Sequence, residues 1–476
     1  MIGIRFLLAG AAVLALAGCA SLTTQEGVRE ATRQSLPELP SQWLVDGALP
    51  GEVEIGWIEK LGDPVLVELV REAQLANRDI LAAAANVEAS YAIARQARSA
   101  LFPAIDAGVT ARESELFENP TAGQTSSVFL SPDYDFSLQA SWEADLWGRI
   151  RAGRNAAYAS AQAVEADFRF AQYSLAAAVA QSYFAVIEAD LQIDVAQRTY
   201  DSYAEIDRIV RVRVREGYAD EQDLRTAASD LATIRDSLEN ALGAKRSAVR
   251  ALEILVGRYP STTLEGAKQL PATPPAPPSG LPSQLLERRP DVIAAERDVS
   301  AAFSELDQTK AARLPILNLT GSVGGSSNEL DNILDGRNLV WSVIGSLLQP
   351  IFDGDLRGSQ VDEADANKRA AVANYAATAL SALEEVENNL DQFTVLRLRE
   401  GALLDARDEA IEAVRLAEFR YKEGETDLID LLNIQQRQFS TEQEFVSIQR
   451  ARVDQWVNLN LALGGSWDTP PDEVQN

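Results

Sequence analysis

The sequence predicts a mostly α-helical chain with a small β part, built from two copies of one unit that combines long helical hairpins with a pair of strands. Three observations carry this prediction: an internal repeat, paired runs of alternating polar and apolar residues, and helical stretches far longer than those of ordinary globular domains. A length of 476 residues and an apolar fraction of 46% allow a large folded core. We therefore expect a folded protein rather than a disordered one.

The first residues have the pattern of a secretory signal that ends in a lipidation motif. Arg5 precedes an apolar run from Phe6 to Leu16, and small residues flank Cys19, the single cysteine of the sequence. The pattern resembles bacterial lipoprotein signals, which are cleaved before a cysteine that then carries acyl chains. We expect residues 1–18 to be a signal peptide and Cys19 to bear the lipid. An ordinary signal peptide with an incidental cysteine is the alternative.

The second half of the sequence repeats the first half. Matches early in each half lie 212 residues apart, and matches late in each half lie 207 residues apart. We expect a lipid-anchored N-terminal segment (19–62), a first repeat (63–260), a Pro-rich linker (261–283), a second repeat (284–465) and a C-terminal tail (466–476). The paired landmarks are Asn77–Ile80 with Arg289–Val292, Leu101–Pro103 with Arg313–Pro315, Arg213–Gly217 with Arg420–Gly424, Asp223-Leu224 with Asp430-Leu431, and Val256-Gly257 with Leu463-Gly464.

Each repeat is expected to open with one helix and to close with two longer ones. The opening helices, over 63–100 and 284–312, end before Pro103 and Pro315. The long helices lack proline, contain many small residues and repeat larger apolar residues at helical spacing. A helix of about 65 residues would be on the order of 100 Å long, so it needs lateral partners; a soluble coiled coil is the alternative. The long helices are predicted over 150–216, 221–257, 358–423 and 427–462.

Between these helices, each repeat contains two strand-like runs with one polar and one apolar face. The runs are Ile105–Ala111 and Phe136–Glu143 in the first repeat, and Leu317–Val323 and Leu339–Leu348 in the second. Strands of about ten residues can cross a membrane when they are tilted. No stretch after the signal reaches the roughly 18 apolar residues of a spanning helix, so we expect strands to make any crossing. Two small soluble hairpins are the alternative.

The composition excludes several classes of function. With 43 basic and 71 acidic residues the net charge is -28, which opposes binding to nucleic acid. The sequence has no histidine and one cysteine, so it lacks the usual groups for imidazole catalysis and for soft-metal sites. We expect no enzyme activity, no metal and no cofactor apart from the lipid on Cys19.

Several motifs occur in a fixed order along the two repeats. They are Leu146-Trp147-Gly148-Arg149, Gly280-Leu281-Pro282-Ser283, Leu286–Asp291, Pro350–Gly354 and an Arg-x-x-x-Gly pattern at Arg213 and Arg420. Together with the lipidation motif they resemble the TolC family of outer-membrane efflux proteins, in particular its OprM- and NodT-like lipoprotein branch. The resemblance covers essentially the mature chain.

This resemblance implies a homotrimer that combines a periplasmic α-barrel with a shared 12-stranded transmembrane β-barrel, to which each subunit gives four strands. It implies an outer-membrane exit duct of a tripartite efflux pump that passes drugs or other small molecules. The implied partners are a periplasmic adaptor and an inner-membrane transporter of the RND type. A lipid-anchored periplasmic adaptor is the alternative, although the sequence has no lipoyl-like β segment. A cell-envelope hydrolase is less favoured, because the carboxylates follow helix faces and caps, without a convergent cluster, a histidine partner or a nucleophile-elbow motif.

The turns that join the long helices contain the candidate functional residues. By resemblance, these tips constrict the periplasmic opening, and residues near them contact the adaptor or stabilise the tip. The alternative is structural. It makes Asp220 and Thr426 helix N-caps, and it places Asp223 and Asp427 in the first turn, where a negative charge is favourable. The glycines would then be left-handed helix ends and the arginines favourable charges in a last turn. The gate candidates are Asp220, Asp223, Asp427 and Asp430. The candidates for adaptor contact or tip stabilisation are Arg213, Gly217, Arg420 and Gly424.

Overall fold

The computed structural model describes residues 24–45, 48–53, 55–117 and 128–466, and the chain divides into two compact units. Unit 1 comprises residues 1–36, 87–164 and 294–376, and unit 2 comprises residues 37–86, 165–293 and 377–476. Each unit therefore takes segments from both repeats. The predicted signal peptide, Cys19 and the tail from residue 467 lie outside the described residues. The predicted domain boundaries stay a prediction.

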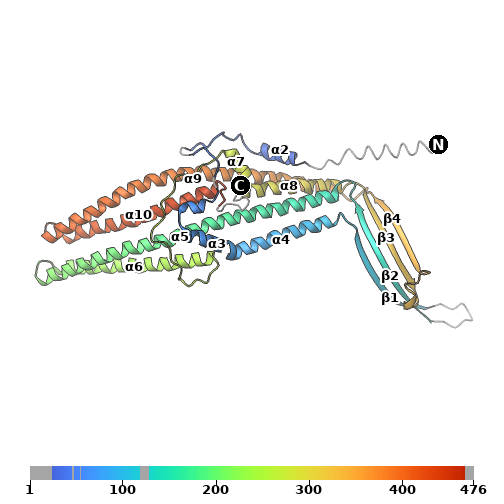
Figure 1. Ribbon diagram of the computed structural model, residues 1–476, viewed down its shortest axis with the longest axis horizontal. Coiled ribbons are helices and arrows are strands. Elements are labelled where there is room, and N and C mark those ends of the chain that lie inside the picture. The colour runs from blue at the N-terminus through green and yellow to red at the C-terminus, as the bar shows by residue number, and fades with distance from the viewer. Residues whose placement is uncertain (1–23, 46–47, 54, 118–127, 467–476) are drawn as a thin grey trace, which may run out of the picture. The chain divides into compact units, whose positions relative to one another are not determined.

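The two long hairpins match their predicted boundaries to within about two residues. Because α5 has 67 residues and α9 has 68, each would be about 100 Å long as a straight helix. Figure 1 shows α6 beside α5, and α10 beside α9. The four helices are α5 (Arg149–Arg215), α6 (Glu221–Leu255), α9 (Leu356–Glu423) and α10 (Leu428–Ala462).

The expectation that no stretch after the signal is apolar enough for a membrane-spanning helix is wrong for α5. This helix contains an 18-residue window that is long and apolar enough to cross a membrane by length and composition. In the fold, apolar residues of α5 such as Val179, Phe184 and Ile187 are fully buried in the helical core of unit 2. Their apolar character is therefore explained by packing between helices.

The opening helix of each repeat is broken, which corrects the single helices predicted over 63–100 and 284–312. The break lies at Asn77 in the first repeat and at Arg289 in the second. In the first repeat, the Asn77 Oδ1 atom accepts hydrogen bonds from the backbone N–H groups of Asp79 (2.9 Å) and Ile80 (3.2 Å), so it starts a new helix. In the second, Pro290 lacks the N–H that a continuous helix would need. The helices are α3 (Pro64–Ala76), α4 (Arg78–Ser99), α7 (Pro282–Arg288) and α8 (Pro290–Ala311).

At both breaks, a side chain donates a hydrogen bond to a carbonyl oxygen at the end of a long helix, although the residue type differs. Asn77 Nδ2 donates to the carbonyl oxygen of Leu255 at the end of α6, at 2.9 Å. Arg289 Nη1 donates to the carbonyl oxygen of Ala462 at the end of α10, at 3.3 Å. Each donor lies 212 residues from its counterpart, and each acceptor lies 207 residues from its counterpart. The internal repeat is therefore visible in the contacts as well as in the sequence.

Two short helices were not predicted. The polar helix α2 (Gln25–Ser35) belongs to unit 1 and buries Val28, and the 3-10 helix η1 (Trp57–Leu61) belongs to unit 2. Trp57 of η1 packs edge-on against Trp456 of α10, with ring centroids 6.0 Å apart. The η1 segment therefore contributes to the core around the C-terminal ends of α6 and α10.

The four strands of unit 1 form one antiparallel sheet in the order β1-β2-β3-β4 (Figure 1). β1 and β2 are longer than the predicted ten residues, because pairing continues past Ala111 and begins at Val128. The strands are β1 (Ala104–Phe117), β2 (Val128–Ala144), β3 (Ile316–Ser327) and β4 (Leu339–Leu348).

The register of the sheet separates apolar from polar side chains. One row across the four strands consists of Ala107, Leu138, Val323 and Trp341, and the adjacent row consists of Asp106, Gln139, Ser322 and Ser342. Because neighbouring residues of a strand point to opposite faces, these rows lie on opposite faces of the sheet. In the polar row, the Ser322 and Ser342 hydroxyls are 2.8 Å apart.

Candidate functional site

The tip of the first hairpin is a tight turn with a cap on each side. Gly217 has φ +79°, and the N–H of Tyr218 donates to the carbonyl of Arg213 at 2.8 Å, which closes the end of α5. Asp220 is the N-cap of α6 and accepts a hydrogen bond from the N–H of Asp223 at 2.9 Å. The structural interpretations of Gly217 and Asp220 are confirmed.

The tip of the second hairpin has the same construction. Gly424 has φ +78°, and the N–H of Glu425 donates to the carbonyl of Arg420 at 2.8 Å. The N-cap of α10 is Asp427, which accepts a hydrogen bond from the N–H of Asp430 at 2.8 Å. Thr426, the predicted cap, lies one residue too early, because Asp427 has the extended backbone of an N-cap and supplies the acceptor.

Arg213 connects the two tips. Its Nη2 atom donates to the carbonyl oxygens of Tyr421 (2.8 Å) and Lys422 (3.2 Å) in the last turn of α9. Its guanidinium carbon lies 4.4 Å from the centre of the Tyr421 ring, within cation–π distance. Arg213 thus places a cation and a hydrogen-bond donor at the carbonyl end of α9, where the helix dipole favours positive charge.

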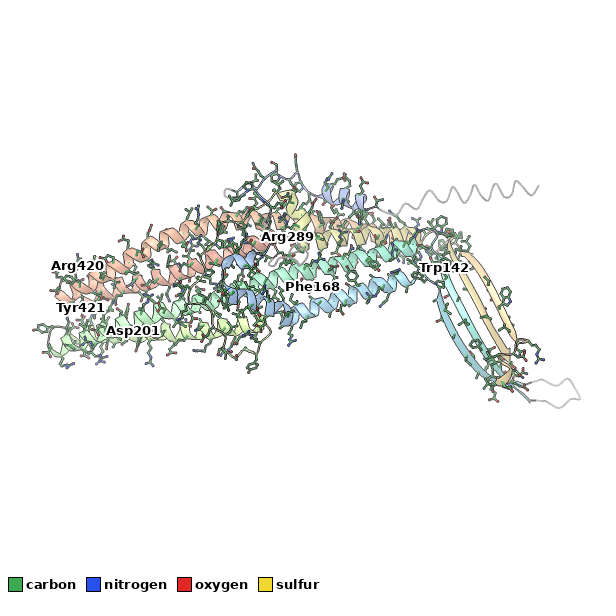
Figure 2. The ribbon with its side chains drawn as sticks, viewed as in Figure 1. Trp142, Phe168, Asp201, Arg289, Arg420 and Tyr421 are labelled. Carbon is green, nitrogen blue, oxygen red and sulfur yellow. The ribbon has the colours of Figure 1, made fainter. Side chains whose placement is uncertain are left out.

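The other candidate residues are placed differently. Arg420, labelled beside Tyr421 in Figure 2, is exposed and forms no hydrogen bond or ion pair through its side chain within the part of the chain that the structure describes. Asp430 is exposed and Asp223 is half-buried. Burial raises the pKa of the Tyr421 phenol, while Arg213 lowers it and the Asp223 carboxylate raises it further. The structure therefore brings Arg213, Tyr421 and Asp223 together and leaves Arg420 apart.

Sequence reasoning missed a line of polar contacts between α5 and α10, which come from opposite hairpins. Their residues lie within long amphipathic helices and look like ordinary solvent-facing positions in the sequence. The contacts join Gln181 to Asn458 (2.6 Å), Glu188 to Arg450 (2.8 Å), Gln192 to the Gln443 carbonyl (2.9 Å) and Arg198 to Glu442 (2.8 Å).

We expect Asp454→Asn to stabilise the protein at neutral pH. The Asp454 carboxylate pairs with Arg450 at 3.0 Å, but burial raises its pKa from 3.8 to about 6 despite that cation. A carboxyl whose folded-state pKa is raised loses stability as the pH rises from the unfolded value to the folded value. The variant should therefore gain more stability at pH 7.5 than at pH 4, as measured by thermal melting in detergent. An equal gain at both pH values would contradict this explanation.

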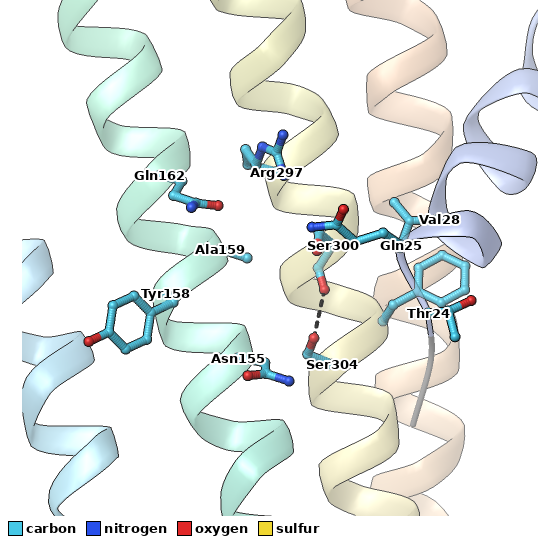
Figure 3. Close-up of a pocket in the computed structure, with 11 residues that line it drawn as sticks. Thr24, Gln25, Val28, Asn155, Tyr158, Ala159, Gln162, Arg297, Ser300 and Ser304 are labelled. Carbon is cyan, nitrogen blue, oxygen red and sulfur yellow. Dashed lines mark hydrogen bonds between the residues drawn. The ribbon is translucent and has the colours of Figure 1, made fainter. Parts of the chain in front are cut away.

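Unit 1 contains an open pocket of about 250 Å³ between α2, α5 and α8 (Figure 3). Arg297, Ser300 and Ser304 line one side of it, and the Ser304 hydroxyl donates to the Ser300 carbonyl at 3.0 Å. That hydroxyl is committed to its own helix and faces no base, so the pocket offers no activated nucleophile. Within the described ranges, no group of three His, Cys, Asp or Glu side chains could hold a metal ion.

Long helical hairpins attached to a sheet with one apolar and one polar face define a channel that crosses a membrane with strands. The family model for outer membrane efflux proteins matches residues 69–258 and 281–465, and the chain belongs to that family. It is therefore an efflux channel of the outer membrane that extends into the periplasm, rather than a periplasmic adaptor. The predicted fold class and the resemblance to TolC-family channels are confirmed.

Named relatives agree with this assignment. The probable efflux pump outer membrane protein SepC of Pseudomonas putida is 32% identical over 88% of this chain and 86% of its own length. The outer membrane protein OprJ of Pseudomonas aeruginosa is 31% identical, over 87% of each chain. Among solved structures, the outer-membrane channel OprN is 27% identical and superposes with a TM-score of 0.82, over 91% of this chain and 99% of that one.

Proposed function

We propose that the chain works as a lipid-anchored homotrimer, the exit duct of a tripartite pump that includes a periplasmic adaptor and an inner-membrane transporter of the RND type. The observation that carries the trimer is the four-stranded sheet, whose two edge strands β1 and β4 have no further partner among the described strands. In a bilayer each unpaired N–H or C=O group costs several kcal/mol, so a sheet of four strands cannot stand alone there. Three copies supply twelve strands, enough for a closed barrel.

The two faces of the sheet support the same proposal. Val109 and Val343, on the apolar face, are 70% and 74% exposed, which suits contact with lipid. The polar face, with its serine, glutamine and carboxylate side chains, suits a wet lumen. No step of this function needs catalysis, a metal or a cofactor. The lipid on Cys19 would hold the N-terminal segment 19–62 at the membrane.

The trimer is tested by imaging protein that has been extracted from the outer-membrane fraction. We expect single particles with threefold symmetry, a barrel at one end and a long hollow helical part. In parallel, palmitate labelling should be lost in Cys19→Ser. Soluble monomers would overturn the trimer, whereas labelling that persists in Cys19→Ser would overturn only the lipid site.

We further propose that the hairpin tips close the periplasmic opening and meet the adaptor. Asp220, Asp223, Asp427 and Asp430 would each occur three times around the axis, and converging carboxylates repel one another or attract cations. Gly217 and Gly424 would set the shape of the tips, and Arg213 and Arg420 would lie on the surface that meets the adaptor.

Arg213→Ala is expected to raise the single-channel conductance in planar bilayers. The substitution removes the hydrogen bonds to α9 and the contact with the Tyr421 ring, which together are worth about 1–3 kcal/mol per subunit. Arg420→Ala is the matched control, because Arg420 has the equivalent position without those contacts and should conduct like the parent. Equal conductance in all three proteins would remove Arg213 from the closing mechanism.

A further inference from the structure

We infer that the junction between the helices and the sheet binds the headgroups of anionic phospholipids, at the boundary between the outer membrane and the periplasm. The cations that hold the lipid phosphates are Arg95, Arg98, Lys310 and Arg313. The inference rests on the proposed contact of the apolar face of the sheet with lipid. We call the nine residues next to the helical end of each strand the junction layer; they are 95–103, 145–153, 307–315 and 349–357, and all belong to unit 1.

The junction layer is cationic in a strongly acidic chain. It contains seven Lys or Arg residues and four Asp residues, a net charge of +3, whereas the whole chain carries -28. Basic residues next to a membrane-spanning segment are attracted to negatively charged lipids, and the attraction falls off within about 10 Å of the surface. The sign of the charge at this level of the molecule therefore suits anionic headgroups.

Only part of this positive charge is neutralised by the chain itself. The three arginines in the first turns of α5 and α9 each pair with a carboxylate, at 2.7–3.0 Å; these pairs are Arg149–Glu143, Arg151–Asp145 and Arg357–Asp353. The four cations near the C-terminal ends of α4 and α8 are exposed, and their side chains form no hydrogen bond or ion pair with another residue that the structure describes. These four can therefore take a phosphate as partner without giving up another one.

A hydrogen bond places the end of α4 beside the lipid-facing side of the sheet. Trp142, labelled in Figure 2 where the helices meet the sheet, lies on the apolar face, because it is four residues from Leu138 in the same strand. Its Nε1 atom donates to the carbonyl oxygen of Leu101 at 3.1 Å. The next residue, Phe102, has its ring centre 5.9 Å from the guanidinium carbon of Arg98. Contacts thus lead from the apolar face directly to this arginine.

The second repeat places the end of α8 in the same way. There, Gln349 Nε2 donates to the carbonyl oxygen of Arg313 at 3.1 Å. The donor and the acceptor lie 207 and 212 residues after those of the first repeat, so the two hydrogen bonds are equivalent. Lys310 lies 212 residues after Arg98. Both helix ends therefore present a cation at the same level and on the same side of the sheet.

Exposed apolar side chains lie in the same layer as the cations. Phe102 is 57% exposed, and Ile351 and Phe352, which follow β4, are 89% and 91% exposed. Aromatic side chains gather where a membrane meets water, because the ring can enter the acyl boundary while neighbouring polar groups stay in water. Cations beside such rings match the phosphate level of a leaflet. A lipid surface accounts for both kinds of side chain.

A cation near a helix C-terminus also has a structural use, because it offsets the helix dipole. That use would lower the stability of the protein in plain detergent when the cation is removed. It would not change how the stability responds to added lipid. The response to lipid is therefore the informative measurement.

Titration of the purified protein with phosphatidylglycerol in a neutral detergent tests the inference, with the melting temperature as the readout. We expect phosphatidylglycerol to raise the melting temperature at a lower mole fraction than zwitterionic phosphatidylcholine does. The test variant replaces the four unpaired cations: Arg95→Gln, Arg98→Gln, Lys310→Gln and Arg313→Gln. Two cations are lost at each helix end, so the midpoint of the titration should move to an about 25-fold higher phosphatidylglycerol concentration, at about fivefold per charge.

Two further variants separate charge from position. The matched control removes four exposed cations of unit 2 that likewise lack a described side-chain partner, and it should keep the midpoint of the parent; it combines Arg235→Gln, Arg246→Gln, Arg250→Gln and Arg437→Gln. A charge-retaining variant with Arg95→Lys, Arg98→Lys and Arg313→Lys should also stay close to the parent, because lysine binds phosphate as a point charge. If the fourfold glutamine variant does not fold, the pair Arg95→Gln with Arg98→Gln and the pair Lys310→Gln with Arg313→Gln are titrated separately, each with an expected shift of about fivefold or more.

The contrary outcomes are distinct. Equal midpoints for the two lipids, or an unchanged phosphatidylglycerol midpoint in the glutamine variants, would overturn the inference and leave the cations as helix-end charges. The same rise in melting temperature with inorganic phosphate would make the ligand a free anion instead of a lipid. An equal shift in the unit 2 control would assign the effect to overall charge. Imaging of the parent sample tests the proposed function separately, because threefold particles that do not respond to phosphatidylglycerol would overturn the lipid site alone.

Discussion

Arg289→Ala is expected to lower the stability of the channel by about 3–5 kcal/mol, because it removes one member of a buried charge cluster. Arg289 is 3% exposed and lies where the first helices of the second repeat meet the end of α10. Its guanidinium pairs with Asp291 at 2.9 Å and with Glu385 at 2.5 Å, and it donates to the Ala462 carbonyl. One side chain therefore ties α8, α9 and α10 together.

The magnitude follows from what the truncated side chain leaves behind. Asp291, 19% exposed, would lose its cation in a partly buried place, and the Ala462 carbonyl would lose a donor. Arg289→Lys should recover only part of the loss, because an ammonium group cannot form the two-pronged contact with Asp291 and reach the carbonyl as well. Thermal melting in detergent and the yield of folded protein in the outer membrane measure the effect.

Two controls distinguish this cause from general damage. Arg288→Ala removes the neighbouring arginine, which forms no hydrogen bond or ion pair through its side chain within the described part of the chain, and should cost little. Asn77→Ala changes the equivalent position of the first repeat, where no charge is involved, and should cost about 1–2 kcal/mol. If Arg289→Ala had the same melting temperature as Arg288→Ala, the charge cluster around Arg289 would not contribute the predicted stability.

The same junctions show where prediction from the sequence stops. The helical periodicity of 63–100 continues through Asn77, so the spacing of apolar residues does not mark the break. The Asn77 side chain caps α4 locally, and it also donates to the Leu255 carbonyl, 178 residues away. Pro290 gave a local signal, but its consequence depends on the contacts of Arg289 with α9 and α10. Hydrogen-bond and ion-pair partners that are far apart in the sequence cannot be predicted from the spacing of residues along it.

The strands and hairpin tips were more predictable because their causes are local. Alternation of side chains determines the two faces of each strand, and glycine at a positive φ determines where α5 and α9 end. The errors are also local: Pro132 and nearby charges hid the outer part of β2, and a threonine beside an aspartate shifted the predicted cap by one residue. Arg213 contacts the carbonyl and the ring of Tyr421. In the sequence, Tyr421 has only the pattern of an ordinary buried position in a long helix.

Glu253→Gln is the second substitution with a large expected effect, at about 2–3 kcal/mol. Glu253 is 1% exposed near the end of α6, where the chain leaves the first repeat for the Pro-rich linker. Its carboxylate accepts hydrogen bonds from the N–H groups of Thr262 (2.8 Å), Thr263 (2.9 Å) and Leu264 (3.3 Å), and from the Ser261 hydroxyl (3.1 Å). An amide has one acceptor oxygen, and its own donors would face these N–H groups, so the linker would lose its attachment.

The pH dependence identifies the carboxylate as the cause. Burial alone would raise the pKa of Glu253, but the hydrogen bonds from Thr262, Thr263, Ser261 and Leu264 hold that pKa below its usual value. A lowered folded-state pKa contributes stability that is present above the unfolded value of about 4.5 and is lost as the pH falls through the folded value. The difference in melting between the parent and Glu253→Gln should therefore be full at pH 7 and shrink below pH 4. Glu265 is an exposed carboxylate in the same segment, so Glu265→Gln should melt like the parent at either pH. A melting difference between Glu253→Gln and the parent that does not depend on pH would indicate packing, instead of charge, as the cause.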